Sequence, residues 1–339
     1  MVTSAPQEAG APSDPLERDG EDRGRRWADA LARYGGRYAL LFVLAAFIAT
    51  FAIWLPDKFW TEANFRAMVN SQAIVLLLAL AATIVLRTGD FDLSIASVMT
   101  LTAATASVIV EDGRSLGLVL VVAIAVGVVV GLINGFLIVK IGVSSFITTL
   151  GMMTALTGAA IAVTNSRQIY NLEGPMLAIA RHKILDFPLR TWYGWLLVLV
   201  LWYVYERTPV GRYLLFIGGS RDAARLAGLN VDAIRIGTFL ASSIVAALTG
   251  IVLAGFLGGI DPNIGPGFLL QPFAAAFLGA TALHVGRFNA VGTLIAIYLL
   301  VVGITGLTLL GAERWVNEVF NGGALVLAVM FARLVGRRR

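Results

Sequence analysis

The chain has 339 residues, of which 58% are hydrophobic and only 14% are charged, and its formal net charge is +5. Soluble domains are about half apolar and about a quarter charged, and a soluble fold of this size lacks the interior to hide so much apolar surface. The composition therefore excludes an ordinary soluble protein and indicates that lipid is the solvent for most of the chain.

Several kinds of chemistry are excluded by the residue types that the chain lacks. It has no cysteine and two histidines, so we expect no disulfide, no metal and no cofactor. It has no Gly-x-x-x-x-Gly-Lys loop for ATP and no hydrolase motif, so we expect no enzyme activity. The pI of about 9.7 does not indicate a nucleic-acid partner, because the basic residues flank apolar runs, as membrane topology requires.

Residues 1–30 are polar and rich in Pro, Gly and mixed charge, which predicts a disordered cytoplasmic tail. They are not expected to form a cleavable signal, because no apolar core lies near Met1. The remainder, 31–339, is predicted to be one all-α integral membrane domain with about ten transmembrane helices of about 20 residues each. The predicted spans are 38–56, 68–87, 93–111, 116–139, 146–164, 191–206, 233–257, 268–284, 289–310 and 318–334.

The orientation follows from the basic residues. An even number of spans places both termini on one side, and most of the 26 Lys and Arg residues lie in the tails and loops of that side. Because cytoplasmic loops carry an excess of Lys and Arg, both termini are predicted to be cytoplasmic. The loop 165–190 argues against this orientation, since it would be external and yet contains Arg167, Arg181, Lys183 and Arg190.

Small residues recur at helical spacing inside the spans. Gly127, Gly131 and Gly135 lie four residues apart, as do Gly151 and Ala155. In lipid this spacing lets two helix backbones approach closely. We therefore expect these positions to pack helices together in a compact bundle.

The first polar segment that interrupts the apolar runs is Arg87–Ser97, with Asp90 and Asp92 at its centre. Acids at a membrane edge are costly and mark functional sites, which leaves a proton relay open. A structural role is equally physical, because Asp92 or Ser94 can cap the helix that follows.

The second polar segment is the connection 207–232. Ser220 is suited to cap a short helix from Arg221 to Ala227, and Gly228 is suited to end it. The helix mixes apolar and basic residues, which fits docking into a groove of another protein as well as an ordinary solvated loop.

These segments resemble a known family. Thr88–Ser97 is similar to its Gly-Gly-x-Asp-Leu-Ser-x-Gly-Ser element, with the family's Asp on Asp92 and Ala96 in place of the later Gly. Gly218–Val231 is similar to its Gly-Gly-Asn-x-x-Ala-Ala-x-x-x-Gly-Ile-x-Val element, with Ser220 in place of Asn. Two further stretches, 134–151 and 286–293, follow in the family's order, with Ser145 in place of a Pro. By this resemblance the chain is identified as a permease of bacterial ATP-binding-cassette (ABC) importers for ribose-, xylose- or arabinose-type sugars.

The resemblance implies a multi-pass permease domain, 31–339, in the bacterial inner membrane. It implies ABC ATPase subunits, a periplasmic or lipid-anchored solute-binding protein, a second permease copy as a homodimer, membrane lipid and a small polar solute as partners. The implied ATPase-coupling helix contains Gly218, Gly219, Ser220, Arg221, Asp222, Ala223, Ala224, Arg225 and Gly228. Polar residues expected in the translocation path or in a structural turn are Asp90, Asp92, Ser94, Asn134, Thr148 and Thr149.

Two rival functions predict different behaviour. A proton-coupled secondary transporter would use Asp90 and Asp92 as its relay and would work without ATP. An intramembrane enzyme or scaffold would need a catalytic set inside the spans, and the sequence contains none. The sequence leaves open the solute, the choice between homodimer and heterodimer, and whether 93–111 spans fully.

Two short segments of the sequence also resemble each other, and we call this likeness the internal echo. Gly89-Asp-Phe-Asp92 and Gly286-Arg-Phe-Asn289 each follow an apolar run. Transporters are often built from internal repeats, so the echo is either a trace of one or a chance match.

Overall fold

The structure, a computed structural model, describes residues 38–336, with side chains through residue 330, so the predicted tail 1–30 lies outside the described residues. The first helix is Tyr38–Trp54. The helices after it are α2 (Pro56–Phe59), α3 (Glu62–Ser71), α4 (Ala73–Leu86), α5 (Ile95–Glu111), α6 (Leu116–Gly135) with its π-helical extension η1 (Phe136–Ile141), α7 (Ser145–Val163), α8 (Pro175–Arg181), α9 (Leu189–Arg207), α10 (Pro209–Gly219), α11 (Arg221–Leu226), α12 (Val231–Leu257), the 3₁₀-helix η2 (Gly265–Phe268), α13 (Leu270–Gly279), α14 (Ala290–Leu309) and α15 (Trp315–Gly336). The strands β1 (Lys183–Ile184) and β2 (Phe187–Pro188) pair antiparallel, with Lys183 opposite Pro188.

Several of these helices begin where the sequence supplies a side-chain cap. In each case an oxygen of the capping residue accepts the backbone N–H three residues later, which satisfies a donor that the helix itself leaves unpaired. The capping residues are Thr61, Ser115, Ser220, Asn230 and Asn289.

Among residues 38–336, five helices are long and apolar enough to cross a membrane by length and composition: Glu62–Leu86, Leu116–Ile141, Ser145–Val163, Val231–Leu257 and Ala290–Leu309. Shorter apolar helices are Tyr38–Trp54, Ile95–Glu111 and Trp315–Met330. The prediction of a mostly helical chain with several apolar spans is confirmed.

One predicted span is wrong as a continuous helix. In place of 268–284 the structure has α13, which has ten residues and is followed by turns. A ten-residue helix is about 15 Å long, half of the hydrocarbon thickness of about 30 Å. The high hydropathy of this segment reflects burial in protein, because Ala274, Ala275 and Ala276 are fully buried and α13 packs against α4, α14 and α15. Non-helical backbone at this depth is tolerated where protein surrounds it.

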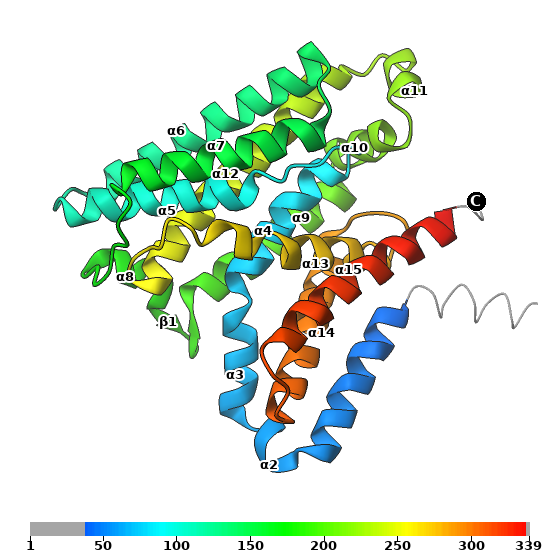
Figure 1. Cartoon of the computed structure of the whole chain (residues 1–339). Helices are drawn as coiled ribbons and strands as arrows, with labels where there is room; N and C mark the ends of the chain where they lie inside the picture. Colours follow the sequence, from blue (N-terminus) through cyan, green and yellow to red (C-terminus); the bar gives the residue numbers. More distant parts are fainter. Residues whose placement is uncertain (1–37, 337–339) are drawn as a thin grey trace, which may run out of the picture.

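Helix α12 is the central element of the fold and packs against α4, α5 and α6 (Figure 1). Its contact with α6 depends on Gly127, Gly131 and Gly135, which face α12 along its length. A Cβ atom on Gly131 would lie 2.7 Å from the Cα of Leu240. The predicted close approach is therefore confirmed for α6, whereas Gly151 on α7 has nothing within 4 Å of an added Cβ.

Helices α5, α6, α7 and α12 lie side by side, while α13, α14 and α15 form a second group below them and α4 lies between the two groups (Figure 1). The short helix α11 stands at the upper right edge of the molecule, and α8 and β1 lie at the opposite end of α12 (Figure 1). We refer to these ends as the α11 end and the α8 end. The arrangement leaves α11 accessible beside the body of the long helices.

The glycine contact predicts a large difference between two equivalent substitutions. Gly131→Leu forces a branched side chain into the backbone of α12 and is expected to destabilise the folded chain by about 1–3 kcal/mol. Gly151→Leu places the same side chain in open space. Thermal unfolding in detergent should show a clearly lowered midpoint for Gly131→Leu only, and equal midpoints would contradict this packing.

Candidate functional site

The loop 87–94 between α4 and α5 turns sharply because Gly89 adopts a positive φ of 77°, a conformation that favours glycine. The turn carries the side chain of Asp90 into the protein, where it is 3% exposed. Asp90 and Asp92, the two acids of this loop, have different surroundings.

Asp90 binds two arginines from distant parts of the chain. Arg235 of α12 donates from Nε and Nη2 to the two carboxylate oxygens, at 2.8 and 2.9 Å. Arg221 of α11 donates from Nη2 to one of the same oxygens at 3.0 Å. A bidentate arginine–carboxylate pair is among the strongest charge-assisted contacts in proteins, so Asp90 joins the loop firmly to α12 and also to α11.

This pairing determines what Asp90 can do. A carboxylate that two guanidinium groups hold in place is a structural ion pair, and it favours the structural interpretation over a proton relay. Both charges of the Asp90–Arg235 pair are buried, so neither can lose its partner cheaply.

Asp90→Asn is expected to destabilise the folded chain by about 3 kcal/mol, because it leaves the buried guanidinium of Arg235 without a counter-charge. Asp232→Asn is the matched control, since Asp232 also pairs with two cations but is partly exposed. Its expected cost is below about 1 kcal/mol. Unfolding midpoints in detergent test the difference, and similar shifts for the two variants would refute the dominant role of Asp90.

Asp92 forms a different arrangement with Ser94 and Asn134. The backbone N–H and the hydroxyl of Ser94 both donate to one Asp92 oxygen, at 3.1 and 2.5 Å. The side-chain amide of Asn134 on α6 donates to the Ser94 hydroxyl at 3.0 Å. The hydroxyl of Thr149 on α7 accepts the N–H of Leu93 at 3.1 Å. These contacts tie the beginning of α5 to α6 and α7.

Burial favours the structural-turn interpretation for this group. Asp92, Ser94, Asn134 and Thr149 are all buried within the subunit. Thr148 does not join the group, and its buried hydroxyl has no hydrogen-bond partner among the described residues. Four of the predicted path residues thus form one connected group, namely Asp92, Ser94, Asn134 and Thr149. Asp90 and Thr148 lie outside this group.

Helix α11 has the predicted form. The Ser220 hydroxyl accepts the N–H of Ala223 at 3.3 Å, and Gly228 follows the helix with a φ of 83°. Ala224 is fully buried against Ile217 and Val231, which fixes one face of the helix on the body of the protein. The glycines before the helix differ: Gly218 lies directly against the backbone of Arg87, whereas Gly219 has open space around it.

The arginines of α11 face the body of the protein. Arg221 contacts Asp90, and Arg225 donates to Asp232 of α12 at 3.1 Å. Asp232 also accepts from Lys140 of η1 at 2.9 Å. Asp222 and Leu226 are directed outward, with Leu226 91% exposed, and the half-exposed Arg225 also lies 3.6 Å from Asp222. The surface that α11 presents therefore combines the apolar Leu226 with the paired charges of Asp222 and Arg225.

Sequence reasoning missed two buried arginines. Arg235 was detectable in principle as a lone charge inside the predicted span 233–257, where an ionisable residue marks a functional or paired site. Arg87 ends α4 and is also buried. It donates to the carbonyl of Phe288 at 2.7 Å, and its guanidinium lies 4.0 Å from the ring centroid of Tyr205.

The two segments of the internal echo lie together. Gly286 has a φ of 83°, matching the positive φ of Gly89. Phe91 and Phe288, at equivalent positions of the echo, both contact Phe277 of α13, with ring centroids 6.2 and 5.3 Å apart from it. The echo is therefore a likeness of conformation and surroundings as well as of sequence.

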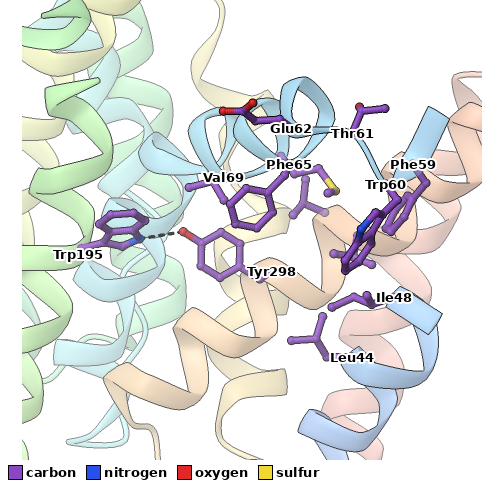
Figure 2. A pocket seen from close by; sticks show the side chains of 13 residues that line it. Leu44, Ile48, Phe59, Trp60, Thr61, Glu62, Phe65, Val69, Trp195 and Tyr298 are labelled. Atoms are coloured by element: carbon purple, nitrogen blue, oxygen red, sulfur yellow. Dashed lines mark hydrogen bonds between the residues drawn. The ribbon is translucent and has the colours of Figure 1, made fainter. Parts of the chain in front are cut away.

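A cavity of about 610 Å³ lies between the first helix, α3 and α14, but its chemistry does not suit a sugar (Figure 2). Its wall is largely apolar, with Leu44, Ile48 and Phe65 among the lining residues. Trp195 and Tyr298 direct their polar atoms at each other, since the indole N–H donates to the phenol oxygen at 2.9 Å (Figure 2). A polar solute needs several converging hydrogen-bond groups, which this cavity does not offer.

Comparisons with known proteins identify the family. The model of the branched-chain amino acid transport system permease component matches residues 64–329. The chain belongs to this permease family. Among the described residues no group of three or more His, Asp or Glu side chains could hold a metal ion.

Curated relatives align along most of their length. The ribose import permease of Escherichia coli (strain K12) is 32% identical over 294 residues, which cover 86% of this chain and 90% of the relative. The L-arabinose ABC transporter permease of Azospirillum brasilense is 28% identical, with 90% and 91% covered. The autoinducer 2 import permease of Yersinia pseudotuberculosis is 29% identical, with 86% and 83% covered. No solved structure matches.

Family membership confirms the resemblance that the motifs indicated and makes the chain an integral membrane permease. It also confirms that the chain is a transport component and not an enzyme, since the relatives are permease proteins. None of the comparisons supports a proton-coupled transporter.

Proposed function

We propose that this chain is the membrane-spanning permease subunit of an ABC importer, and that it moves a monosaccharide or a similar small polar solute across a bacterial inner membrane. The names of the ribose, arabinose and allose relatives support the class of solute. The observation that carries the proposal is α11, a capped short helix at one end of the molecule whose Leu226 side chain projects into solvent.

The proposed contact with the ATPase follows from this exposure. A short exposed helix with an apolar side chain is suited to a groove in another protein. Leu226 and Asp222 would provide the direct contacts. Arg225 and the buried Ala224 would hold the helix in position from behind.

In this proposal about ten membrane segments cross the bilayer, with α3 and α4 acting as one span and the segment around α13 crossing as a broken helix. Both termini and α11 are placed in the cytoplasm. The cluster of Arg221, Arg225, Lys140 and Arg235 at the α11 end supports this orientation, because cytoplasmic loops are rich in Lys and Arg.

The remaining partners are a periplasmic or lipid-anchored solute-binding protein and a second copy of the chain. Asn134 and Thr149 are buried within one subunit, which favours their structural role, and we place the translocation path between two copies. The solute would pass along that junction while ATP binding shifts the population between outward- and inward-open states.

The test is capture of the partner ATPase in detergent by the full chain and by Leu226→Asp. The substitution puts a charge where an apolar contact is proposed, so capture should fall by about tenfold or more. Leu185→Asp is the matched control, because Leu185 is also highly exposed, at 78%, but lies near β1 at the α8 end. If the unaltered chain captures no ATPase, the proposed function is wrong. If both variants capture it fully, α11 is not the contact.

A further inference from the structure

The two arginines that bind Asp90 are not equivalent. Asp90 and Arg235 are held by two short hydrogen bonds, and their side chains are 3% and 7% exposed. Arg221 makes one bond to the same carboxylate and is 37% exposed. Its other contacts are weak, since the carbonyls of Thr88 and Gly89 lie 3.4 Å from its Nη2.

This asymmetry permits one contact to open while the other stays closed. If Arg221 moves away, its guanidinium reaches water and the Asp90 carboxylate remains paired with Arg235. If Arg235 moves away, a buried charge loses a bidentate partner at a far greater cost. The Arg221–Asp90 contact is therefore the one that can be broken without leaving a buried charge unpaired.

The chain around this contact is built for a small displacement. Gly219, the last residue of α10, has open space around it, and Gly228 follows α11 with a φ of 83°, so glycine backbone lies on both sides of the helix. Gly218 touches the backbone of Arg87, at the start of the loop 87–94. That loop continues into Asp92 and Ser94, which tie the beginning of α5 to α6 through Asn134.

We propose that the Arg221–Asp90 contact opens and closes during transport and passes movement of α11 to the loop 87–94 and to α12. This inference rests on the proposed function, because it takes the ATPase to move α11. In it, Arg221 is a positioning residue of the transport cycle and not a residue that docks the ATPase. Asp90 is the fixed end of the link, through its pair with Arg235.

The experiment uses the absence of cysteine in the chain. Phe91→Cys places one thiol in the loop 87–94 at a partly exposed position, and its rate of labelling by a maleimide reports the environment of that loop. The full chain is reconstituted with its ATPase and labelled without nucleotide and after trapping with ATP and vanadate. Labelling should change by about fivefold or more between the two states.

Arg221→Gln in the Phe91→Cys chain should keep ATPase capture and lose that nucleotide-dependent change, and Arg221→Lys should restore part of it. Arg212→Gln is the control, because Arg212 is exposed on the neighbouring α10, outside the ion network, and it should behave like the parent. The link is refuted if Arg221→Gln retains the change, if it loses ATPase capture, or if the parent binds ATPase without any change. A parent that captures no ATPase refutes the proposed function and the link together.

Discussion

A charge inside a membrane protein must find its partner within the protein, because lipid supplies none. In this chain that constraint falls on Asp90. Its carboxylate lies where the loop 87–94, α11 and α12 meet, and it is neutralised by arginines from the two helices. This one buried carboxylate therefore constrains how α11, the loop 87–94 and α12 lie relative to one another.

The two sides of α11 have different chemistry as a result. Arg221 binds Asp90 and Arg225 binds Asp232, so both arginines are engaged on the side that faces the protein. The other side presents the exposed Leu226 next to Asp222, which also pairs with the half-exposed Arg225.

Local features of the fold were predictable from the sequence, and distant partners were not. The cap at Ser220, the end of α11 at Gly228 and the close approach at Gly127, Gly131 and Gly135 follow from neighbouring residues. The partner of Asp90 lies 145 residues away, and nothing local to either residue specifies it. The failed span at 268–284 has a related cause, because hydropathy does not distinguish burial in lipid from burial among α4, α14 and α15.

The internal echo has a geometric consequence. The loop after α4 and the loop after α13 each place a phenylalanine against Phe277, and Arg87 of the first loop binds the carbonyl of Phe288 in the second. Both loops therefore share one aromatic ring as a neighbour. A substitution at Phe277 would disturb the two loops at once, including the one that holds Asp90.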